Sequence, residues 1–582
     1  PHMIWTEESG LLQSRRWQTA PPVDQEHLAR FAGLSPLVVQ LLHNRGIQDR
    51  GEAEDFLAGR FRADNPFHLA GMSEAVTRLR HAIRDGEQIA VYGDFDTDGV
   101  TATALLVQTL KALGARVEPY IPHRVDEGYG LNLDALWNLY LHGAGVVVTV
   151  DCGIRSLQEV EQASRGLSLI VTDHHSLGQA LPPAEAVINP KRPDSAYPFR
   201  DLAGVGVAYK LAQALLRAVK RNDSSPSFSE ENLLDLVALG TVADLVPLRG
   251  ENRALVRQGL ARLNEHPRPG VEALMAESGL RRGEIDATAI GFRLGPRLNA
   301  AGRIDTAMLA YRLLTSRDPH QTRDLARQLD ALNRRRQELT EEIVAAAEAQ
   351  VLADDPQAPL FLAASPDFLP GVVGLAASRL TEAYYRPSVV VEQGEDESRG
   401  SCRSIPEFDI SAALDQCSDL LIRYGGHQAA AGFTVATHKL DALARRLRAI
   451  AAEQLADEEL RPWLEIDVEV PLEEMNWASH TLLQQLEPCG MQNPQPILLS
   501  RDVEVHDRRA IGSERTHLKL GLRDRAGVFW DAVFFRHGHL LDEVPGRIDV
   551  AYTLEANVWN GHRRLQLNVQ DLRESSDPSA NE

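Results

Sequence analysis

Short apolar runs alternate with helical segments over the first part of the chain. The runs at 89–92, 146–150 and 167–172 are rich in aliphatic residues, and each has the length of a buried strand. The segment 100–113, which follows the first run, has the apolar spacing of a helix. Strands that alternate with helices predict a parallel sheet covered on both faces. Since ligands bind at the carboxyl ends of such strands, we expect functional residues directly after these three runs.

The rest of the chain contains three further kinds of pattern. A helical region covers about 230–351, and its long charged part at 318–351 suits a rigid connector. A second α/β pattern begins near 358, with apolar runs at 360–362 and 388–391. After about 457 the pattern is mostly β, and five short strands with turn signals between them fit a small barrel such as an OB-fold. These strands are predicted at 503–505, 517–522, 528–535, 548–554 and 565–569.

The predicted fold class is therefore α/β, with a parallel-sheet domain, a second α/β domain joined to it by a long helix, and a C-terminal β-barrel. The expected organisation is an N-terminal segment at 1–45, a parallel-sheet domain at 46–250, a helical connector at 251–352, a second α/β domain at 353–457, an OB-fold at 458–572 and a disordered tail at 573–582.

Composition excludes several classes of protein. Hydrophobic residues make up 43% and charged residues 25%, which rules out a wholly disordered or fibrous chain. No stretch approaches the roughly 20 apolar residues of a membrane span, so no membrane partner is expected. The four cysteines, Cys152, Cys402, Cys417 and Cys489, are too far apart for a disulfide framework or a CxxC zinc site. We therefore expect a cytoplasmic protein.

Net charge says little about nucleic-acid binding. The chain has 61 basic and 82 acidic residues, which gives a formal net charge of -21. This balance argues against a protein that is broadly coated by nucleic acid, because phosphate binding needs Lys and Arg. It leaves open a local basic channel or a metal site, because a sum says nothing about distribution.

The strongest local signal is the acidic segment at 93–99, which follows the first apolar run. It places Asp94, Asp96 and Asp98 at alternate positions between two glycines. Their mutual repulsion is unfavourable unless cations bind there. An EF-hand does not fit, because a strand precedes the segment and Leu105 stands where that motif needs Glu. A solvated acidic loop remains an alternative on this motif alone.

Two other strand ends strengthen the metal hypothesis. Asp151 follows the second run, and the triplet Asp173-His174-His175 follows the third, so parallel neighbouring strands would bring all of them to one edge. Asp244 lies inside an apolar run and needs a partner if it is buried, although a helix cap is an alternative. This oxygen-rich set suits Mn²⁺ or Mg²⁺ better than zinc. Two ions roughly 3.5–4 Å apart would favour phosphoryl displacement, with Asp151 as the bridging ligand.

The motifs DFDTDG, TVDCG, DHH and TVADLVP resemble the four motifs of the DHH phosphoesterase superfamily. Further segments are similar to the RecJ-like single-strand-specific exonucleases within it, in the right order over about 30–570. These segments are 297–304, 371–374, 377–380, 401–406, 424–427 and 487–496.

The resemblance implies an architecture and an activity. The architecture is a DHH domain, a connecting helix, a DHHA1 domain over the cleft, and an OB-fold that completes a ring around one DNA strand. The activity is degradation of single-stranded DNA from the 5′ end to mononucleotides with Mn²⁺ or Mg²⁺, with two ions expected, in recombination and repair. A single-strand-binding protein and a helicase are expected partners, and a ring formed by one chain suggests a monomer.

The resemblance also implies a set of metal and catalytic residues. One ion would be bound by Asp98, Asp151, His174 and Asp244, and the other by Asp96 and Asp151 together with Asp94. Asp173 and His175 would orient or polarise the site, so that Asp151, Asp173, His174 and His175 form the catalytic set.

Phosphate-binding residues are implied in the second half of the chain. Arg303, Ser401 and Arg403 match positions used for DNA phosphates, including a 5′-terminal one, and the planar guanidinium suits phosphate oxygens. A helix-end salt bridge is the alternative for Arg303. The segment Gly425, Gly426, His427 suits a loop whose N–H groups approach a phosphate, with a plain turn as the alternative.

The sequence departs from the family pattern at a few positions. Phe368 and Leu369 stand where an aromatic residue and a His are usual, so no role of that His carries over. Cys489 and Met491 replace the more common Phe and Gly, away from the expected chemistry.

Two other functions are weighed against the exonuclease. A DHH phosphodiesterase for oligonucleotides or cyclic dinucleotides is typically shorter and lacks the β-rich region at 460–570. A non-catalytic DNA-binding scaffold would need eroded metal motifs, and here these motifs are intact.

Overall fold

The computed structural model describes residues 15–124, 126–219, 228–559 and 562–575. The chain forms two compact units, one of residues 61–458 and one that joins residues up to 60 with those from 459 onwards. Most of the tail that was predicted to be disordered, 576–582, lies outside the described residues. Among the helices of the described part, none has the length and apolar character needed to cross a lipid bilayer.

The first unit contains the parallel sheet that the sequence predicts. Its strand order is β3-β2-β4-β5-β6, and every neighbouring pair is parallel. The three strands predicted from the apolar runs therefore lie side by side, and their carboxyl ends meet at one edge. The strands are β2 (Gln88–Tyr92), β3 (Arg116–Tyr120), β4 (Ala144–Val150), β5 (Ser168–Thr172) and β6 (Ala186–Ile188).

Helices cover both faces of this sheet because alternate strand residues point to opposite sides. Val146 and Val148 belong to the apolar core shared with α4, α5, α8 and α9, whereas Val147 belongs to the core shared with α6 and α7. The helices are α4 (Met72–Asp85), α5 (Thr97–Ala112), α6 (Leu133–Leu141), α7 (Leu157–Ala163), α8 (Gly204–Val219) and α9 (Leu234–Ala243).

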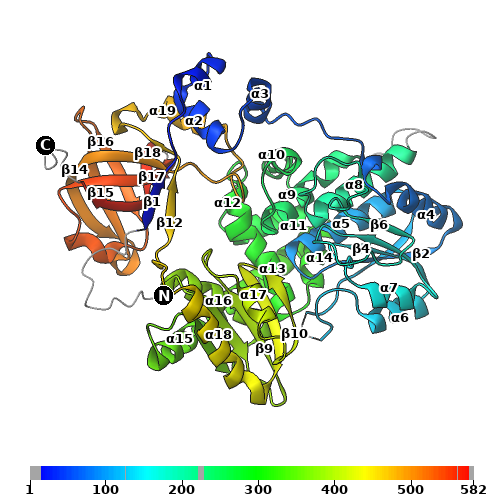
Figure 1. Ribbon diagram of the computed structural model, residues 1–582. Helices are drawn as coiled ribbons and strands as arrows, with labels where there is room; N and C mark the ends of the chain where they lie inside the picture. The colour runs from blue at the N-terminus through cyan, green and yellow to red at the C-terminus, as the bar shows by residue number, and fades with distance from the viewer. Residues whose placement is uncertain (1–14, 125, 220–227, 560–561, 576–582) are drawn as a thin grey trace. The chain divides into compact units, whose positions relative to one another are not determined.

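A helical region follows the sheet and ends in one long helix (Figure 1). This helix, α15 (Pro319–Asp354), has 36 residues and begins after the N-cap Asp318, whose side chain accepts a hydrogen bond from the N–H of His320. The predicted rigid connector is therefore a continuous helix, which contacts both α13 and α16. The preceding helices are α10 (Gly250–Glu265), α11 (Pro269–Glu277), α12 (Ala287–Ala289), α13 (Gly295–Ile304) and α14 (Met308–Thr315).

The second sheet belongs to the same compact unit. Its order is β10-β11-β9-β8-β7, in which β7 and β8 are parallel and the other pairs are antiparallel. Apolar residues of α15 and α16 pack on β7 and β8, which attaches this domain to the connector. The elements are β7 (Phe361–Ser365), α16 (Pro370–Tyr384), β8 (Ser388–Glu392), β9 (Glu397–Arg403), α17 (Ile410–Asp415), β10 (Leu421–His427), β11 (Ala430–Ala436) and α18 (Leu440–Gln454).

The second unit is built on the predicted barrel. Strands run in the order β13-β14-β15-β16-β18-β17, and the pairing of β14 with β17 closes the barrel, as expected for an OB-fold. N-terminal residues join it, because β1 pairs in parallel with β12 and α2 contributes to the barrel core. The elements are β1 (Arg16–Thr19), α1 (Gln25–Arg30), α2 (Pro36–Asn44), α3 (Arg50–Ala58), β12 (Trp463–Ile466), β13 (Val468–Glu469), α19 (Trp477–Gln484), β14 (Leu498–Ile511), β15 (His517–Arg523), β16 (Phe529–Phe534), β17 (Arg547–Trp559) and β18 (His562–Glu574).

Candidate active site

The acidic segment forms the turn between β2 and α5. Asp96 caps α5, because its Oδ1 accepts a hydrogen bond from the N–H of Gly99 at 3.0 Å. Asp98 lies in the first helical turn and is buried, as is Asp94 in front of the helix. A Cβ on Gly99 would lie 2.5 Å from the backbone oxygen of Asp94, so the tight turn requires glycine there. The three carboxylates thus share one small volume at the carboxyl end of β2.

Asp151 lies directly after β4 in a strained backbone conformation. Its φ is +63°, in the left-handed region that non-glycine residues rarely adopt. The carboxyl group is buried against the start of α8, where a Cβ on Gly204 would lie 2.5 Å from its Oδ1. Strained backbone of this kind is common at functional sites. The fold therefore fixes this carboxylate in a place where only glycine leaves room for it.

The triplet after β5 divides into a fully bonded carboxylate and two imidazole groups. Asp173 accepts hydrogen bonds from the backbone N–H groups of Ile154, His174 and His175 at 2.7–3.0 Å, and its Oδ1 lies 2.8 Å from Nδ1 of His175. These bonds hold its pKa below the ordinary value despite its burial. Asp173 thus orients His175, while the Nε2 atom of His174 is free for another partner.

Asp98 is positioned by the first turn of α8. Its two carboxylate oxygens accept hydrogen bonds from the N–H groups of Gly204 and Val205 at 2.7 and 2.8 Å. Asp244 ends α9 and lies near the imidazole, with its Oδ2 3.5 Å from Nε2 of His174. Oδ1 of Asp151 lies 3.2 Å from the same nitrogen. Three segments of the chain, which carry Asp151, His174 and Asp244, therefore meet at one imidazole nitrogen.

Three sets of ligand atoms each lie within 4.8 Å of one another. Asp151 belongs to two of the sets and His174 to two, so the sets overlap as a two-ion centre requires. Within the described residues, Oδ1 of Asp94, Oδ1 of Asp151 and Nε2 of His174 are buried and have no hydrogen-bond partner. Unpartnered buried oxygens and an imidazole nitrogen fit a hard divalent cation such as Mn²⁺ or Mg²⁺. The sets are Asp151, His174, His175; Asp98, His174, Asp244; and Asp94, Asp96, Asp151.

The electrostatics of the site also indicate a cation. Burial and neighbouring carboxylates raise the pKa of Asp94, Asp151 and Asp244 well above the ordinary value. The same two causes raise the pKa of Asp98 to about 7. Burial and the neighbouring His175 lower the pKa of His174 to about 3, so its imidazole is neutral and can donate a lone pair. Without a cation, this arrangement is unfavourable at neutral pH.

Arg303, Ser401 and Arg403 lie together around the N-terminus of α16. Nη1 of Arg303 donates a hydrogen bond to the Gly371 carbonyl at 3.1 Å. A Cβ on Gly374 would lie 2.9 Å from Oγ of Ser401 and 3.3 Å from Nη2 of Arg403, so these groups approach the helix closely. The first turn of α16, a hydroxyl and two guanidinium groups thus form one anion-attracting corner.

Arg303 is partly buried, and other cations lie near it. Its burial and the charges of Arg124, Arg336 and Arg403 lower its pKa to about 10. In the part of the chain that the structure describes, no carboxylate forms an ion pair with its guanidinium, so the salt bridge considered from sequence is not observed. A partly buried guanidinium among like charges favours an anion such as phosphate.

The segment Gly425, Gly426, His427 is a strand, so the expected loop was wrong. It forms the end of β10, an exposed strand at the edge of the second sheet that pairs with β11. A Cβ on Gly426 would overlap the carbonyl of Ala430. The close packing of the hairpin therefore explains why a glycine stands at this position. A role of this segment in phosphate binding stays a prediction.

Sequence reasoning missed two residues that follow β3. The guanidinium of Arg124 lies 4.6 Å from the centre of the Phe95 ring, and the negative charges of Asp94 and Asp96 act on it. The hydroxyl of Tyr129 lies 3.3 Å from Nδ1 of His175, and the side chain is 59% exposed. Both follow the carboxyl end of a parallel strand, so the rule applied to the other strands would have found them if 116–120 had been recognised as one.

Three family models match the chain. The DHH family N-terminal domain matches residues 88–241, the DHHA1 domain matches 357–453, and the RecJ OB domain matches 466–571. The matches follow the order of the parallel sheet, the second sheet and the barrel.

Relatives and solved structures agree over nearly the whole chain. The single-stranded-DNA-specific exonuclease RecJ of Bacillus subtilis (strain 168) is 38% identical over 571 residues, which cover 96% of this chain and 71% of the relative. The structure of RecJ in complex with Mn²⁺ from Thermus thermophilus has a TM-score of 0.83 at 32% identity and covers 97% of this chain and 81% of that one. The Mg²⁺ complex from the same organism has a TM-score of 0.77 at 31% identity, with coverage of 97% and 79%. The chain therefore belongs to the RecJ family of the DHH phosphoesterases.

Proposed function

We propose that this protein is a metal-dependent exonuclease that hydrolyses single-stranded DNA from its 5′ end and releases 5′-mononucleotides. The observation that carries the proposal is the buried group of overlapping ligand sets beside an arginine-rich corner. The relatives' names support the choice of single-stranded DNA as substrate, and the Mn²⁺ and Mg²⁺ complexes of the similar structures support the choice of ion.

The residues divide the chemistry between them. Asp98, His174 and Asp244 hold one ion, Asp94 and Asp96 hold the other, and Asp151 is shared between them. Bound ions supply charge stabilisation and lower the pKa of a bound water molecule. Asp173 keeps the imidazole of His175 in a fixed orientation through the contact between its Oδ1 and Nδ1. Arg124 neutralises charge that develops on the scissile phosphate.

The 5′ polarity comes from the corner at α16. A terminal phosphate carries more charge than a phosphodiester and suits the paired guanidinium groups of Arg303 and Arg403, with Ser401 as a further donor. In this arrangement no residue has to recognise the hydrogen-bonding edge of a base, so we expect little preference for particular sequences.

Arg303→Gln tests the 5′-phosphate corner. Removing a hydrogen-bonded charge costs about 1.5–3 kcal/mol, so KM for a 5′-phosphorylated oligonucleotide is expected to rise about 10–100-fold. An oligonucleotide with a 5′-hydroxyl should be affected much less, because it lacks the recognised group. Steady-state kinetics on the two substrates measure the difference, with Arg335→Ala as control, since Arg335 is half-exposed on α15 and pairs with Glu338 and Glu342. Equal effects on both substrates would contradict the assignment.

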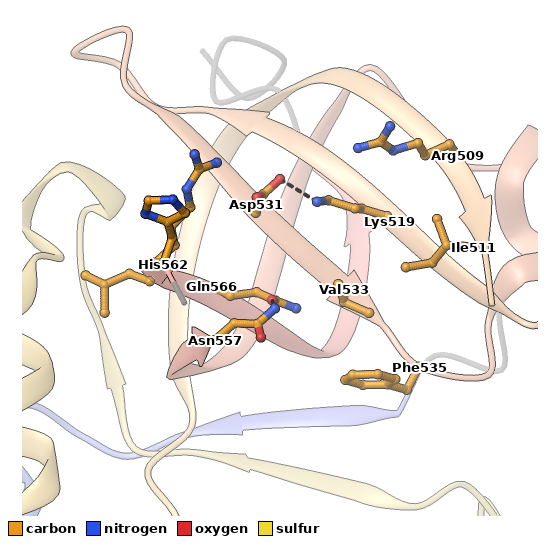
Figure 2. Close-up of a pocket in the computed structure, with 11 residues that line it drawn as sticks. Arg509, Ile511, Lys519, Asp531, Val533, Phe535, Asn557, His562 and Gln566 are labelled. Carbon is orange, nitrogen blue, oxygen red and sulfur yellow. Dashed lines mark hydrogen bonds and ion pairs between the residues drawn. The ribbon is translucent and has the colours of Figure 1, made fainter. Parts of the chain in front are cut away.

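The barrel provides a second nucleic-acid surface within its own unit. A groove of about 560 Å³ opens between the barrel strands, and Figure 2 shows side chains from several strands around it. Arg509 and Arg564 line it, and Lys519 is partly neutralised by Asp531 at 2.9 Å. The ring of Phe535 is 48% exposed at the same groove, which suits stacking of a base. We assign this groove to the binding of single-stranded DNA.

The double variant Arg509→Ala with Arg564→Ala tests the groove. We expect binding of a long single strand to weaken about tenfold at moderate salt, and the slope of log K against log salt to fall by roughly 1.4, because two phosphate contacts are lost. The value of kcat on a short oligonucleotide should stay unchanged. Fluorescence anisotropy over a salt series measures both quantities, with Arg50→Ala as control, since Arg50 pairs with Glu54 on α3. An unchanged slope of log K against log salt would show that the groove does not bind DNA.

Three substrates separate this function from the others. With Mn²⁺, we expect hydrolysis of 5′-phosphorylated single-stranded DNA and little hydrolysis of duplex DNA or of a cyclic dinucleotide. With a chelator, all hydrolysis should stop. Preference for the cyclic dinucleotide would overturn the proposal, and inactivity on every substrate would favour a DNA-binding scaffold.

The proposal includes the setting in which the enzyme works. A single-strand-binding protein and a helicase supply the unwound strand, and the enzyme acts as a monomer in the cytoplasm. Cys152, Cys402 and Cys417 are buried thiols, which is consistent with a reducing compartment. Light scattering tests the monomer, and a dimer mass at micromolar concentration would contradict it.

A further inference from the structure

We propose that Asn299 is a positioning residue that holds the acidic turn of the metal centre against α13. The inference rests on the proposed function, because it assumes that the carboxylates of this turn bind the ions. It adds a residue from the helical region, about 200 positions away in the sequence, to the set that determines metal affinity.

The contact is a double hydrogen bond to a single threonine. Oδ1 of Asn299 accepts hydrogen bonds from the backbone N–H of Thr97 at 2.7 Å and from its hydroxyl at 2.9 Å. Thr97 stands between Asp96 and Asp98, which carry two of the proposed ligand groups. Movement of this threonine would therefore displace both carboxylates.

The backbone of α13 also packs closely against the acidic turn. A Cβ on Gly302 would overlap the carbonyl oxygen of Phe95, so α13 touches the turn directly one helical turn beyond Asn299. The hydroxyl of Thr97 also lies 3.4 Å from the Gly295 carbonyl at the start of the helix. The turn thus rests on α13 at its beginning, its middle and near its end.

The position of Asn299 links the two parts of the active site. Arg303 lies four residues later on the same helix, about 6 Å further along the axis, and bonds to Gly371 in the phosphate corner. One helical turn therefore fixes the spacing between the acidic turn and the terminal-phosphate corner. Such a fixed spacing suits an enzyme that removes one nucleotide at each step.

The physical role follows from the charges of the turn. Asp94, Asp96 and Asp98 repel one another, so the turn needs external bonds to keep the arrangement that an ion requires. Residues that orient metal ligands typically change metal affinity or activity by about 10–100-fold when they are removed. Asn299 supplies two such bonds without adding charge.

Calorimetric titration of the metal-free protein with Mn²⁺ tests this role independently of activity. Asn299→Ala removes both bonds and is expected to weaken Mn²⁺ binding at least tenfold. Thr97→Val keeps the shape and the backbone bond but loses the hydroxyl bond, so its loss should be intermediate. Asn299→Asp keeps an acceptor oxygen and should therefore bind Mn²⁺ more tightly than Asn299→Ala does.

Asn264→Ala provides a matched control in the same unit. Asn264 also makes several hydrogen bonds, to Leu260 and Ile285, and lies away from the acidic turn in sequence and in contacts. Its removal should lower the melting temperature while leaving Mn²⁺ affinity unchanged. If Asn299→Ala does not fold, the isosteric Thr97→Val variant still decides the question.

Kinetics at saturating Mn²⁺ give the second readout. Asn299→Ala should lower kcat while KM for a 5′-phosphorylated oligonucleotide stays close to wild type, because the phosphate corner keeps its residues. Wild-type Mn²⁺ affinity in both Asn299→Ala and Thr97→Val would overturn the inference alone. Full activity of an Asp151→Ala variant would instead overturn the proposed function, so the two failures are distinguishable.

Discussion

Asp151→Ala should abolish hydrolysis of single-stranded DNA while leaving most DNA binding intact. Asp151 contributes to two of the three ligand sets, so its loss affects both proposed ions. Because the ions supply several kcal/mol of charge stabilisation, we expect kcat/KM to fall by about 10³-fold or more. Binding of an oligonucleotide in chelator should change less than about threefold, since the arginine residues remain. Hydrolysis assays with controlled Mn²⁺ and anisotropy measure the two effects.

Two controls accompany this variant. Asp85→Ala removes an exposed carboxylate that pairs with Arg84, and it should change neither the rate of hydrolysis nor the affinity for DNA. Asp151→Ala itself should raise the melting temperature of the metal-free protein, because it removes a buried carboxyl group surrounded by other carboxylates. Near-normal nuclease activity in the variant would refute the assignment of Asp151 as a shared ligand.

Removal of the metal should destabilise the protein more at high pH than at low pH. The folded-state pKa values of Asp94, Asp151 and Asp244 are raised, and that of Asp98 is about 7. A carboxyl group with a raised pKa favours folding when it is protonated, and this contribution is lost as pH rises through the folded-state value. The metal-free protein should therefore lose stability as pH rises through 7.

Mn²⁺ should restore this stability, and its effect should grow with pH because ligands must lose protons before they bind. The lowered pKa values of His174, about 3, and of Asp173 act in the opposite direction but below pH 6.5. Thermal unfolding with chelator and with Mn²⁺ at pH 6.5 and 8 measures the difference. An equal shift in melting temperature at the two pH values would show that these carboxyl groups are not the ligands.

Much of the site could be predicted from sequence because it follows a simple rule of parallel sheets. The strands before Asp94, Asp151 and Asp173 are apolar on both faces, and such runs are easy to recognise. Once the strands are adjacent, their carboxyl ends meet without further information. The barrel was predictable for a similar reason, since its strands are separated by clear turn signals.

The missing residues lie where the sequence has no strong periodic signal. The strand before Arg124 is at the sheet edge and only partly buried, so its residues do not form an apolar run. The hydrogen bond from Thr97 to Asn299 depends on how two helices pack, which helical spacing does not specify. The pair Gly425-Gly426 predicted a loop, whereas close packing in a hairpin also requires small residues.

The pairing of β1 with β12 has a consequence for synthesis on the ribosome. Trp17 donates a hydrogen bond to Asp571 at 2.7 Å, so the first and last described segments complete one unit. The intervening unit of residues 61–458 is translated between them, which takes roughly 20–80 s at typical rates. The N-terminal helices therefore have no barrel to pack against until the final strands have been synthesised. A chaperone that shields exposed apolar surface would have its longest opportunity to act on residues 15–60.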